Sequence, residues 1–212
     1  LEHGPLSVES AQDMIRAALL AGAAPVVRVG SNEPHAILRA LDIGAHGVQI
    51  PHVDSRGSAE AAVRWSKYAP LGERGVCRYV RAAGYSSLDK RRYFEKANRE
   101  TLVIVHIEGR EGLRNLDDIL SVEGLDVVFI GPYDLSQSLG VPGEVDNPLV
   151  LEKMRQAVNK ARAAGVAVGT FVDDLEAARS WANMGVQYIS YSVDVGILYE
   201  ACARVVKAIK QF

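Results

Sequence analysis

The chain lacks the long apolar runs of membrane proteins, and it has little cysteine and little net charge. No segment approaches the ~18 uninterrupted apolar residues that a membrane helix needs, so we expect no membrane partner. Its two cysteines, Cys77 and Cys202, lie far apart without the spacing of a metal or redox motif, which favours a reducing, cytoplasmic environment. The formal net charge of -2 gives no electrostatic reason to expect nucleic acid. A small molecule is therefore the expected partner.

Motifs of several other α/β enzymes are also missing. No G-x-G-x-x-G stretch follows an early predicted strand, which disfavours an open sheet that binds dinucleotides. No lysine stands at the end of a predicted strand, so a Schiff-base mechanism would lack its nucleophile. The turns at 170–173 and 192–194 are not the glycine-rich turns that bind phosphate in many barrels, which disfavours phosphorylated substrates.

Strand and helix patterns alternate along the chain, and no Pro-, Gly- or Ser-rich linker divides it, so we expect a single domain over residues 1–212. This alternation predicts an α/β fold with a parallel sheet. The strand count fits a (β/α)8 TIM barrel whose first strand and most of whose second are absent from the chain shown. The predicted strands begin near Pro25, Gly47, Thr101, Val127, Val166 and Tyr188.

Residues 71–100 break the alternation and are rich in arginine and lysine. The segment is longer than an ordinary connection. It is either a solvated surface elaboration or a cover that reaches over the site or over a neighbouring subunit.

The clearest chemical signal lies in residues 101–137. Two continuously apolar strands, one ending in Glu108 and the other running into Asp134, flank a helix predicted from about Glu111 to Leu120. Parallel strands joined by one helix place their carboxyl ends side by side, so the two acids should face one small volume. Two acids there repel unless a cation lies between them, and oxygen ligands favour magnesium or manganese over zinc. The alternative is that each acid merely caps the helix that follows it.

Polar residues also stand at the ends of other predicted strands. An arginine that ends an apolar strand, as Arg28 does, needs an anionic partner, and a substrate carboxylate would supply a bidentate one. Histidines can transfer protons near neutral pH, and His3, His52 and His106 all fall at strand ends. These residues together predict an active site for a small carboxylate.

Several motifs in the chain resemble those of a known family. The run VHIEGREGLRNLDDILSVEGLDVVFIGPYDLSQSLG, with EHGPLS at the start and PVVRVGSNEPHAI between, closely resembles the HpcH/HpaI family of metal-dependent pyruvate aldolases, to which 4-hydroxy-2-oxoheptanedioate aldolase belongs. The motifs E-H-[AG]-P, V-R-x-x-x-N-[DE]-P, I-E-x-[RK] and G-P-x-D-L-S occur in this order, and the resemblance covers essentially the whole chain.

The resemblance implies a class II aldolase, which cleaves or forms 4-hydroxy-2-oxo acids. The products are pyruvate and an aldehyde, and the reaction passes through a metal-stabilised pyruvate enolate. It also implies a divalent cation, magnesium or manganese with cobalt as a further option, and a homo-oligomer that is a hexamer in the family. By the same resemblance Glu108 and Asp134 are metal ligands, Arg28 stabilises the enolate charge, and His3 is the general base.

Further roles follow from the same resemblance. The backbone amides of Tyr133 and Asp134 correspond to donors that bind the substrate carboxylate, and His106 takes the place of a substrate-binding glutamine. Asp42 resembles an acid that raises the basicity of the catalytic histidine. Our strand map puts Asp42 at the opposite end of the barrel from His3, so we expect a neighbouring subunit to bring them together. The alternative is a helix-end acid with no catalytic part.

Two other functions stay open at this point. One is a lyase that acts on a coenzyme A thioester, as the citrate lyase β-subunit group does; it would need a basic cleft, for which residues 71–100 are the only candidate. The other is a non-catalytic barrel that binds a small carboxylate.

Overall fold

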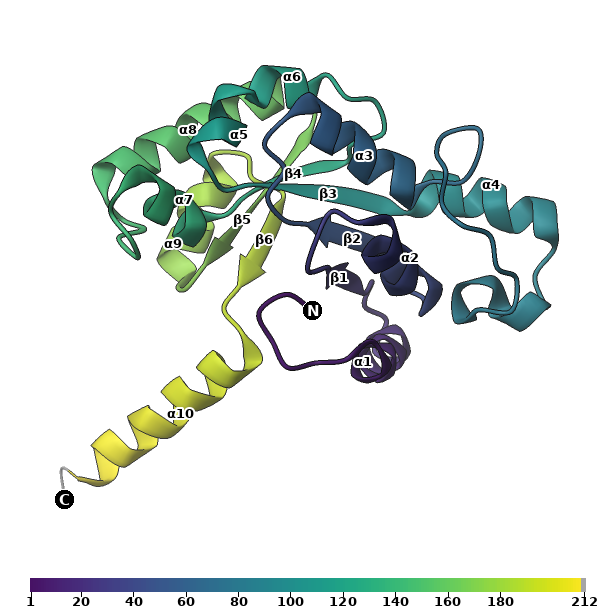
Figure 1. Cartoon of the computed structure of the whole chain (residues 1–212). Coiled ribbons are helices and arrows are strands. Elements are labelled where there is room, and N and C mark those ends of the chain that lie inside the picture. The colour runs from purple at the N-terminus through teal and green to yellow at the C-terminus, as the bar shows by residue number, and fades with distance from the viewer. Residues whose placement is uncertain (211–212) are drawn as a thin grey trace.

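The computed structural model describes residues 1–210 and contains one curled sheet of six parallel strands in sequential order (Figure 1). The predicted α/β class and all six predicted strands are confirmed. The sheet is a half-barrel, and within the described residues β1 and β6 are its two edges. The strands are β1 (Val26–Arg28), β2 (Gly47–Ile50), β3 (Leu102–Ile107), β4 (Val127–Ile130), β5 (Ala167–Val172) and β6 (Tyr188–Tyr191).

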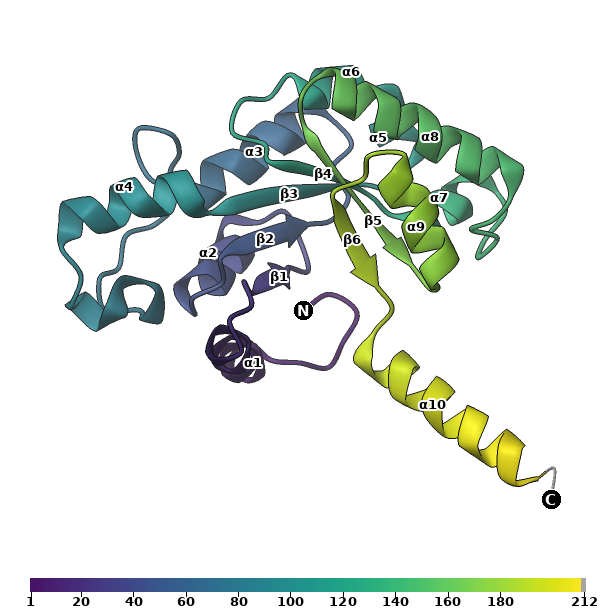
Figure 2. The same ribbon diagram turned by 180° about the vertical axis from the view of Figure 1, so that it is seen from behind.

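Helices alternate with these strands, and most of them cover the convex face of the sheet (Figures 1 and 2). The prediction of one helix from Glu111 to Leu120 is wrong. The segment forms two short helices that meet at Asn115. The side chain of Asn115 donates to the carbonyl of Asp54 at 2.7 Å, which fixes the break. The helices are α1 (Val8–Leu20), α2 (Pro34–Asp42), α3 (Arg56–Ser66), α4 (Lys90–Glu100), α5 (Arg110–Arg114), α6 (Leu116–Leu120), α7 (Pro132–Leu139), α8 (Pro148–Ala163), α9 (Leu175–Asn183), α10 (Asp194–Ile209) and the 3-10 helix η1 (Arg81–Ser86).

The core has a part on each face of the sheet, because successive side chains of a strand point to opposite faces. The larger part lies between the convex face and the helices and includes Val105, Ile107 and Val128, all fully buried. A smaller cluster of Ile104, Val127 and Phe129 fills the concave face. Burial on both faces explains why β3 and β4 read as continuous apolar runs.

The strand register arranges the concave face in rows. His106 pairs with Phe129, Phe129 with Gly169, and Gly169 with Tyr188. A Cβ at Gly169 would lie 2.7 Å from the Phe129 ring and 2.8 Å from the Tyr188 ring, so only glycine leaves room for both aromatic rings. This packed row forms the floor under the carboxyl ends of the strands.

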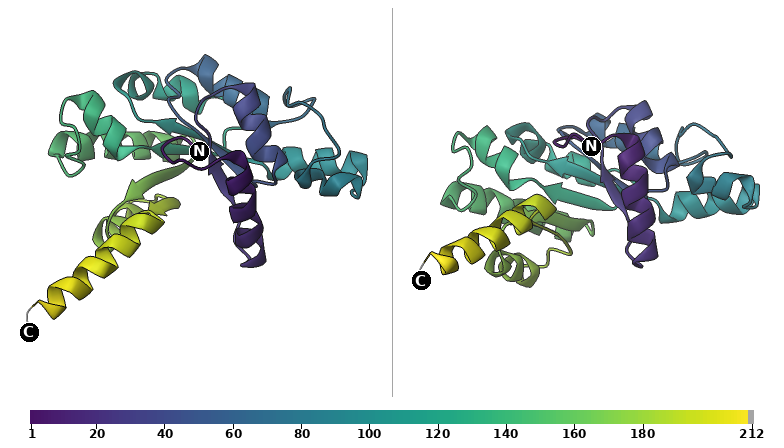
Figure 3. Two further views of the ribbon diagram at one scale, coloured as in Figure 1. Left: turned by 60° about the horizontal axis from the view of Figure 1, so that its bottom comes forward. Right: turned by 90° about the horizontal axis from the view of Figure 1, so that it is seen from below.

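Helix α10 differs from the other helices because it projects away from the sheet (Figures 1 and 3). None of its residues is buried, and apolar side chains such as Leu198 and Tyr199 are 65% and 75% exposed. Among the described residues, no helix has the length and apolar character needed to cross a membrane.

Candidate active site

Glu108 lies at the centre of a polar cluster at the carboxyl end of β3. Its side chain is 3% exposed, and Oε1 accepts the backbone N–H of His52 at 2.8 Å. Oε2 has only long contacts, at 3.3 Å from His106 Nδ1 and 3.5 Å from Arg28 Nη2. One carboxylate oxygen is therefore firmly held, and the other is held loosely.

The end of β4 is shaped to fit this carboxylate. Gly131 follows β4, and a Cβ there would lie 2.9 Å from Glu108 Oε2. Helix α7 begins one residue later with Pro132, which lacks the N–H that a first-turn residue does not need. Asp134 lies in this first turn and is half-buried. The two predicted ligands thus come from the ends of adjacent strands, as expected.

The first turn of α7 also supplies free donors. No side chain caps the helix, and the first N–H groups of any helix have no partner inside it. The backbone amides of Tyr133 and Asp134 belong to this set. The Tyr133 side chain turns elsewhere, because its hydroxyl donates to Asp173 at 2.7 Å, and this bond raises the pKa of Tyr133 to about 12.

The environment of Glu108 favours its ionised form. Burial opposes ionisation, but the bond from His106, the backbone N–H of His52 and the charge of Arg28 together outweigh burial and lower the pKa of Glu108 to about 2. The carboxyl group is therefore an anion at neutral pH, as a metal ligand must be.

His106 is a buried histidine whose second ring nitrogen is free. Its ring stacks on Phe129 with the centroids 4.4 Å apart. Burial lowers the pKa of His106, which favours the neutral ring. Its Nε2 atom is buried and has no hydrogen-bond partner among the described residues. An orphaned polar atom of this kind costs free energy, which a bound ligand would recover.

Arg28 ends β1 and connects two carboxylates. Besides its contact with Glu108, its Nε forms an ion pair with Glu2. The amino group of Leu1 donates to the Arg28 carbonyl at 2.6 Å, which fastens the N-terminal segment beside β1. The sequence predicts a substrate anion as the partner of Arg28, whereas the structure also brings Glu2 to it.

His52 is a second contact that the sequence indicated only weakly. Its Nδ1 lies 3.1 Å from Glu108 Oε1, and its Nε2 lies 3.7 Å from Glu2 Oε1. Its φ of 53° is in the left-handed region, which is uncommon for a residue other than glycine. This conformation places both its backbone N–H and its ring against Glu108, and strained residues of this kind concentrate at functional sites.

The two remaining predicted residues lie outside this cluster. His3 is at the rim, with its side chain 70% exposed and its Nε2 3.9 Å from Glu2 Oε1. Asp42 ends α2, before β2 begins, so it lies at the opposite end of the sheet. There it accepts a hydrogen bond from Arg74 Nη2 at 2.7 Å. The structure therefore separates Asp42 from His3 within one chain.

The donor set fits a magnesium-type cation. Within residues 1–210 no group of three or more His, Cys, Asp or Glu side chains could hold a metal. The protein would thus supply two carboxylates, Glu108 and Asp134. Water and substrate would fill the other coordination positions, as is common for Mg²⁺ in proteins. The loosely held Glu108 Oε2, with the space that Gly131 leaves beside it, would be the available ligand atom.

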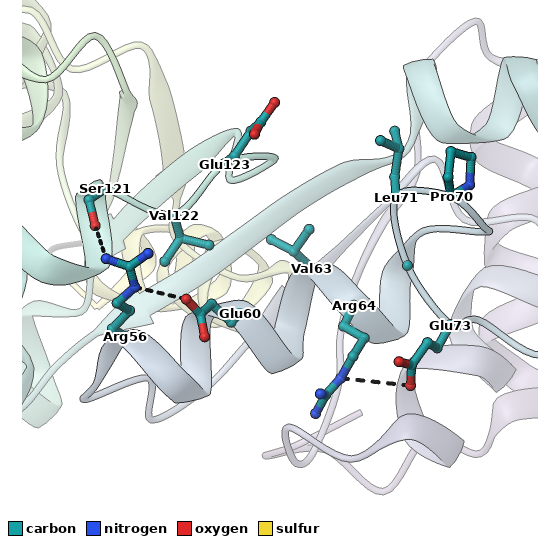
Figure 4. Close-up of a pocket in the computed structure, with 11 residues that line it drawn as sticks. Arg56, Glu60, Val63, Arg64, Pro70, Leu71, Glu73, Ser121, Val122 and Glu123 are labelled. Atoms are coloured by element: carbon teal, nitrogen blue, oxygen red, sulfur yellow. Dashed lines mark hydrogen bonds and ion pairs between the residues drawn. The ribbon is translucent and has the colours of Figure 1, made fainter.

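A pocket on another part of the surface offers no comparable chemistry. Figure 4 shows it between α3 and the turn before β4, with a volume of about 500 Å³. Its charged side chains are paired with one another, Arg56 with Glu60 and Arg64 with Glu73. No unpaired polar group among these four calls for a ligand.

Comparison with known families decides the affiliation. Residues 1–201 match the family model described as HpcH/HpaI aldolase/citrate lyase. The chain belongs to this family. The 4-hydroxy-2-oxo-heptane-1,7-dioate aldolase of Shigella flexneri is 36% identical over 201 residues, which are 94% of this chain and 74% of that protein. The predicted resemblance is therefore confirmed.

Solved structures of HpcH/HpaI proteins share the fold. A family protein from Burkholderia cenocepacia is 35% identical with a TM-score of 0.93, over 99% of this chain and 83% of that one. Citrate synthase SbnG is 32% identical with a TM-score of 0.89, over 100% of this chain and 82% of that one. The family and the names of its members indicate an enzyme of the aldolase/lyase type that acts on small molecules.

Proposed function

We propose that this HpcH/HpaI protein is a class II aldolase that cleaves 4-hydroxy-2-oxo acids to pyruvate and an aldehyde, or forms them from these two compounds. The observation that carries this proposal is the state of Glu108. It is a buried carboxylate, ionised at neutral pH, with one oxygen loosely held beside the start of α7, where Asp134 lies. Such an atom suits a divalent cation, magnesium, manganese or cobalt.

A divalent cation held by Glu108 and Asp134 would supply Lewis acidity that makes a 2-oxo acid easier to enolise. The side chains around it would bind and orient the acid. Arg28 would stabilise the negative charge that develops on the enolate oxygen. The free amides of Tyr133 and Asp134 would bind the substrate carboxylate, and His106 Nε2 would accept a hydrogen bond from a hydroxyl group of the bound acid.

His3, at the rim of the site, would carry out the proton transfer. In the cleavage direction His3 would take the proton of the 4-hydroxyl group as the bond between C3 and C4 breaks. Its exposure suits a group that exchanges protons with water. Glu2, which lies next to His3 in sequence and contacts Arg28, would connect the two side chains and stabilise His3 once it has taken the proton.

We further propose that the site is completed by a second copy of the chain. In this arrangement residues 1–212 form one domain, part of an eight-stranded barrel, and the barrels assemble into a homo-oligomer, a hexamer by family resemblance. Asp42 of one subunit would reach His3 of its neighbour and raise the basicity of that histidine. The separation of Asp42 from His3 within one chain supports this proposal.

Exchange of the C3 protons of pyruvate, followed by NMR in deuterated water, tests the proposal. We expect exchange to require Mg²⁺ or Mn²⁺, and Glu108→Gln to lower the rate by about a thousandfold. Calorimetry should show that Glu108→Gln and Asp134→Asn weaken Mn²⁺ binding, whereas the exposed control Glu123→Gln should not. Borohydride with pyruvate should leave the protein mass unchanged. Exchange that survives thorough chelation would overturn the metal-dependent mechanism.

A second candidate is a citrate-forming synthase, favoured by the likeness to citrate synthase SbnG. The coenzyme A alternative has less support, because residues 71–100 follow α3 and precede β3, at the end of the sheet opposite Glu108. Assays for pyruvate release from 4-hydroxy-2-oxo acids and for citrate formation distinguish these candidates.

A further inference from the structure

A second cavity lies at the amino end of the sheet. It has a volume of about 420 Å³ and is lined by the loop before β2, by η1 and by α4. β3 begins at this end and carries Glu108 after its other end, about 20 Å away at 3.3 Å per residue. The cavity is therefore separate from the proposed active site of the same chain.

Two arginines in the wall of this cavity each have a buried nitrogen without a partner. The Arg74 side chain is 2% exposed, and its guanidinium lies 4.7 Å from the Tyr68 ring centroid. Arg74 Nη2 donates to Asp42, but Arg74 Nε has no partner among the described residues. The same holds for Arg81 Nε. Each such N–H loses its hydration without a replacement, which is costly for a charged group.

The charges around the cavity do not balance. Arg74 is paired with Asp42, and Lys96 lies 3.6 Å from Glu100. No acidic side chain within 4.0 Å of Arg81 is found in the described part of the chain. Arg81 thus contributes one positive charge that the surrounding protein does not compensate.

Apolar side chains line much of the rest of the cavity, beside His46, Lys96, Glu100 and Thr101. Leu41 and Tyr93 are buried, whereas Tyr85 and Leu88, which also line the cavity, are 57% and 48% exposed. A ligand with an apolar body would therefore be accommodated beside the two guanidinium groups. A cavity of this volume suits a small organic molecule and not a polymer.

We propose that this cavity binds a small organic anion with one carboxylate or phosphate head on an apolar body. The head lies between Nε of Arg74 and Nε of Arg81, and the body lies against Tyr85, Leu88 and Tyr93. Because Arg74 also holds Asp42, ligand binding here acts directly on the ion pair of that residue.

Calorimetric titration of the full chain in EDTA tests this site, with benzoate and phenyl phosphate as probes and methyl benzoate as the uncharged control. We expect one saturable site per chain for at least one anion, with a Kd of about 1 mM or tighter. The head group that binds more tightly identifies carboxylate or phosphate as the natural chemistry. Methyl benzoate should not bind.

Matched variants locate the site. Arg81→Met should weaken binding by about tenfold to a hundredfold. Arg81→Lys keeps the charge and the fold but lacks Nε, and it should weaken binding less than Arg81→Met does. Arg91→Met removes an arginine that is 89% exposed on the same segment and should change nothing. Glu108→Gln should also bind normally, which separates this test from the proposed aldolase activity. Absence of saturable binding, or binding that depends on Glu108 and not on Arg81, would overturn the proposal.

Discussion

Two buried charged groups near opposite ends of β3, Lys67 and Glu108, are held differently. At the amino end, Lys67 Nζ donates to the carbonyls of Thr101 at 2.6 Å and Asn98 at 3.0 Å. The Asn98 side chain in turn bonds both the N–H and the carbonyl of Tyr68, at 2.6 Å and 2.9 Å. At the carboxyl end, Glu108 Oε2 has only contacts of 3.3 Å and 3.5 Å.

This difference separates groups that hold the fold from groups that are kept available. Short bonds from Lys67 to backbone carbonyls fasten the α4–β3 connection. The loose contacts of Glu108 and the orphaned Nε2 of His106 leave capacity for a ligand. Preorganised but incompletely satisfied polar groups are what an active site requires.

The largest expected effect is at Arg28, and it should fall on activity alone. Arg28→Met removes the charge beside the developing enolate and should lower kcat for pyruvate release by about a hundredfold to a thousandfold. The free energy of unfolding should change by only about 1 kcal/mol, because Arg28 is 27% exposed and its ion pairs are partly screened. Steady-state kinetics measure the loss of kcat, and urea unfolding measures the change in unfolding free energy. Arg16→Met, which breaks an exposed pair on α1, is the control and should alter neither.

Lys67 should show the opposite behaviour. Lys67→Met keeps the buried stem but leaves the buried Thr101 carbonyl and the partly buried Asn98 carbonyl without this donor, which should cost about 2–3 kcal/mol of unfolding free energy. Activity per folded molecule at 25 °C should be unchanged, since Lys67 lies at the other end of β3 from Glu108. Urea unfolding measures the loss, with the exposed Lys90→Met as the control. A large fall in kcat without loss of stability would show that the two ends are not separable.

Asp42 lies at the amino end of the sheet, where Arg74 holds it, but we propose that it acts at the carboxyl end of a neighbouring subunit. Asp42→Asn should therefore lower kcat by about tenfold while the chain stays folded. Mixed oligomers of Asp42→Asn and His3→Ala chains, refolded together, should recover activity above the sum of the two. Each mixed interface can join an intact Asp42 to an intact His3. Without recovery, the residue is a helix-end acid paired with Arg74.

The fold was predictable because local patterns and global packing agree. The apolar runs of β3 and β4 signalled strands buried on both faces, and Ile104, Val127 and Phe129 do fill the concave side. Glu108 was noticeable in the sequence because a charged residue rarely ends such a strand. Its buried position beside Gly131 follows from the parallel register of β3 and β4.

Contacts between distant segments could not be predicted in the same way. The pair of Glu2 and Arg28 depends on how the N-terminal segment returns along β1, which the Leu1 amino group fixes. The break at Asn115 depends on the carbonyl of Asp54, in the loop before α3. Such partners are set by tertiary packing and not by periodicity. For Glu2, the available signal was its place in the E-H-x-P motif next to His3.

The smallest effect expected concerns the pH dependence of stability at His106. Burial lowers the pKa of His106 below its ordinary value of about 6.5, so between the two pKa values the unfolded chain binds more protons than the folded one. Stability must therefore fall as the pH drops through about 6.5, and it stops falling below the folded pKa. His106→Gln keeps a polar side chain but removes the proton.

Urea unfolding of both proteins at pH 8, 7, 6 and 5 isolates this contribution, because the two chains differ only at residue 106. The difference between wild type and His106→Gln should shrink on acidification by at most about 1.4 kcal/mol per pH unit, the free energy of one proton. Glu108 does not account for this effect, because its pKa is lowered from 4.5 to about 2. The stability that it contributes is lost mainly as the pH falls from 4.5 to about 2. A constant difference would mean that folding leaves the pKa of His106 unchanged. A difference that instead grows on acidification would mean that His106 is protonated in the folded protein. In that case the ring would form an ion pair with Glu108 and would not be available to bind substrate. His106 would then resemble Lys67, a buried group whose bonds hold the fold.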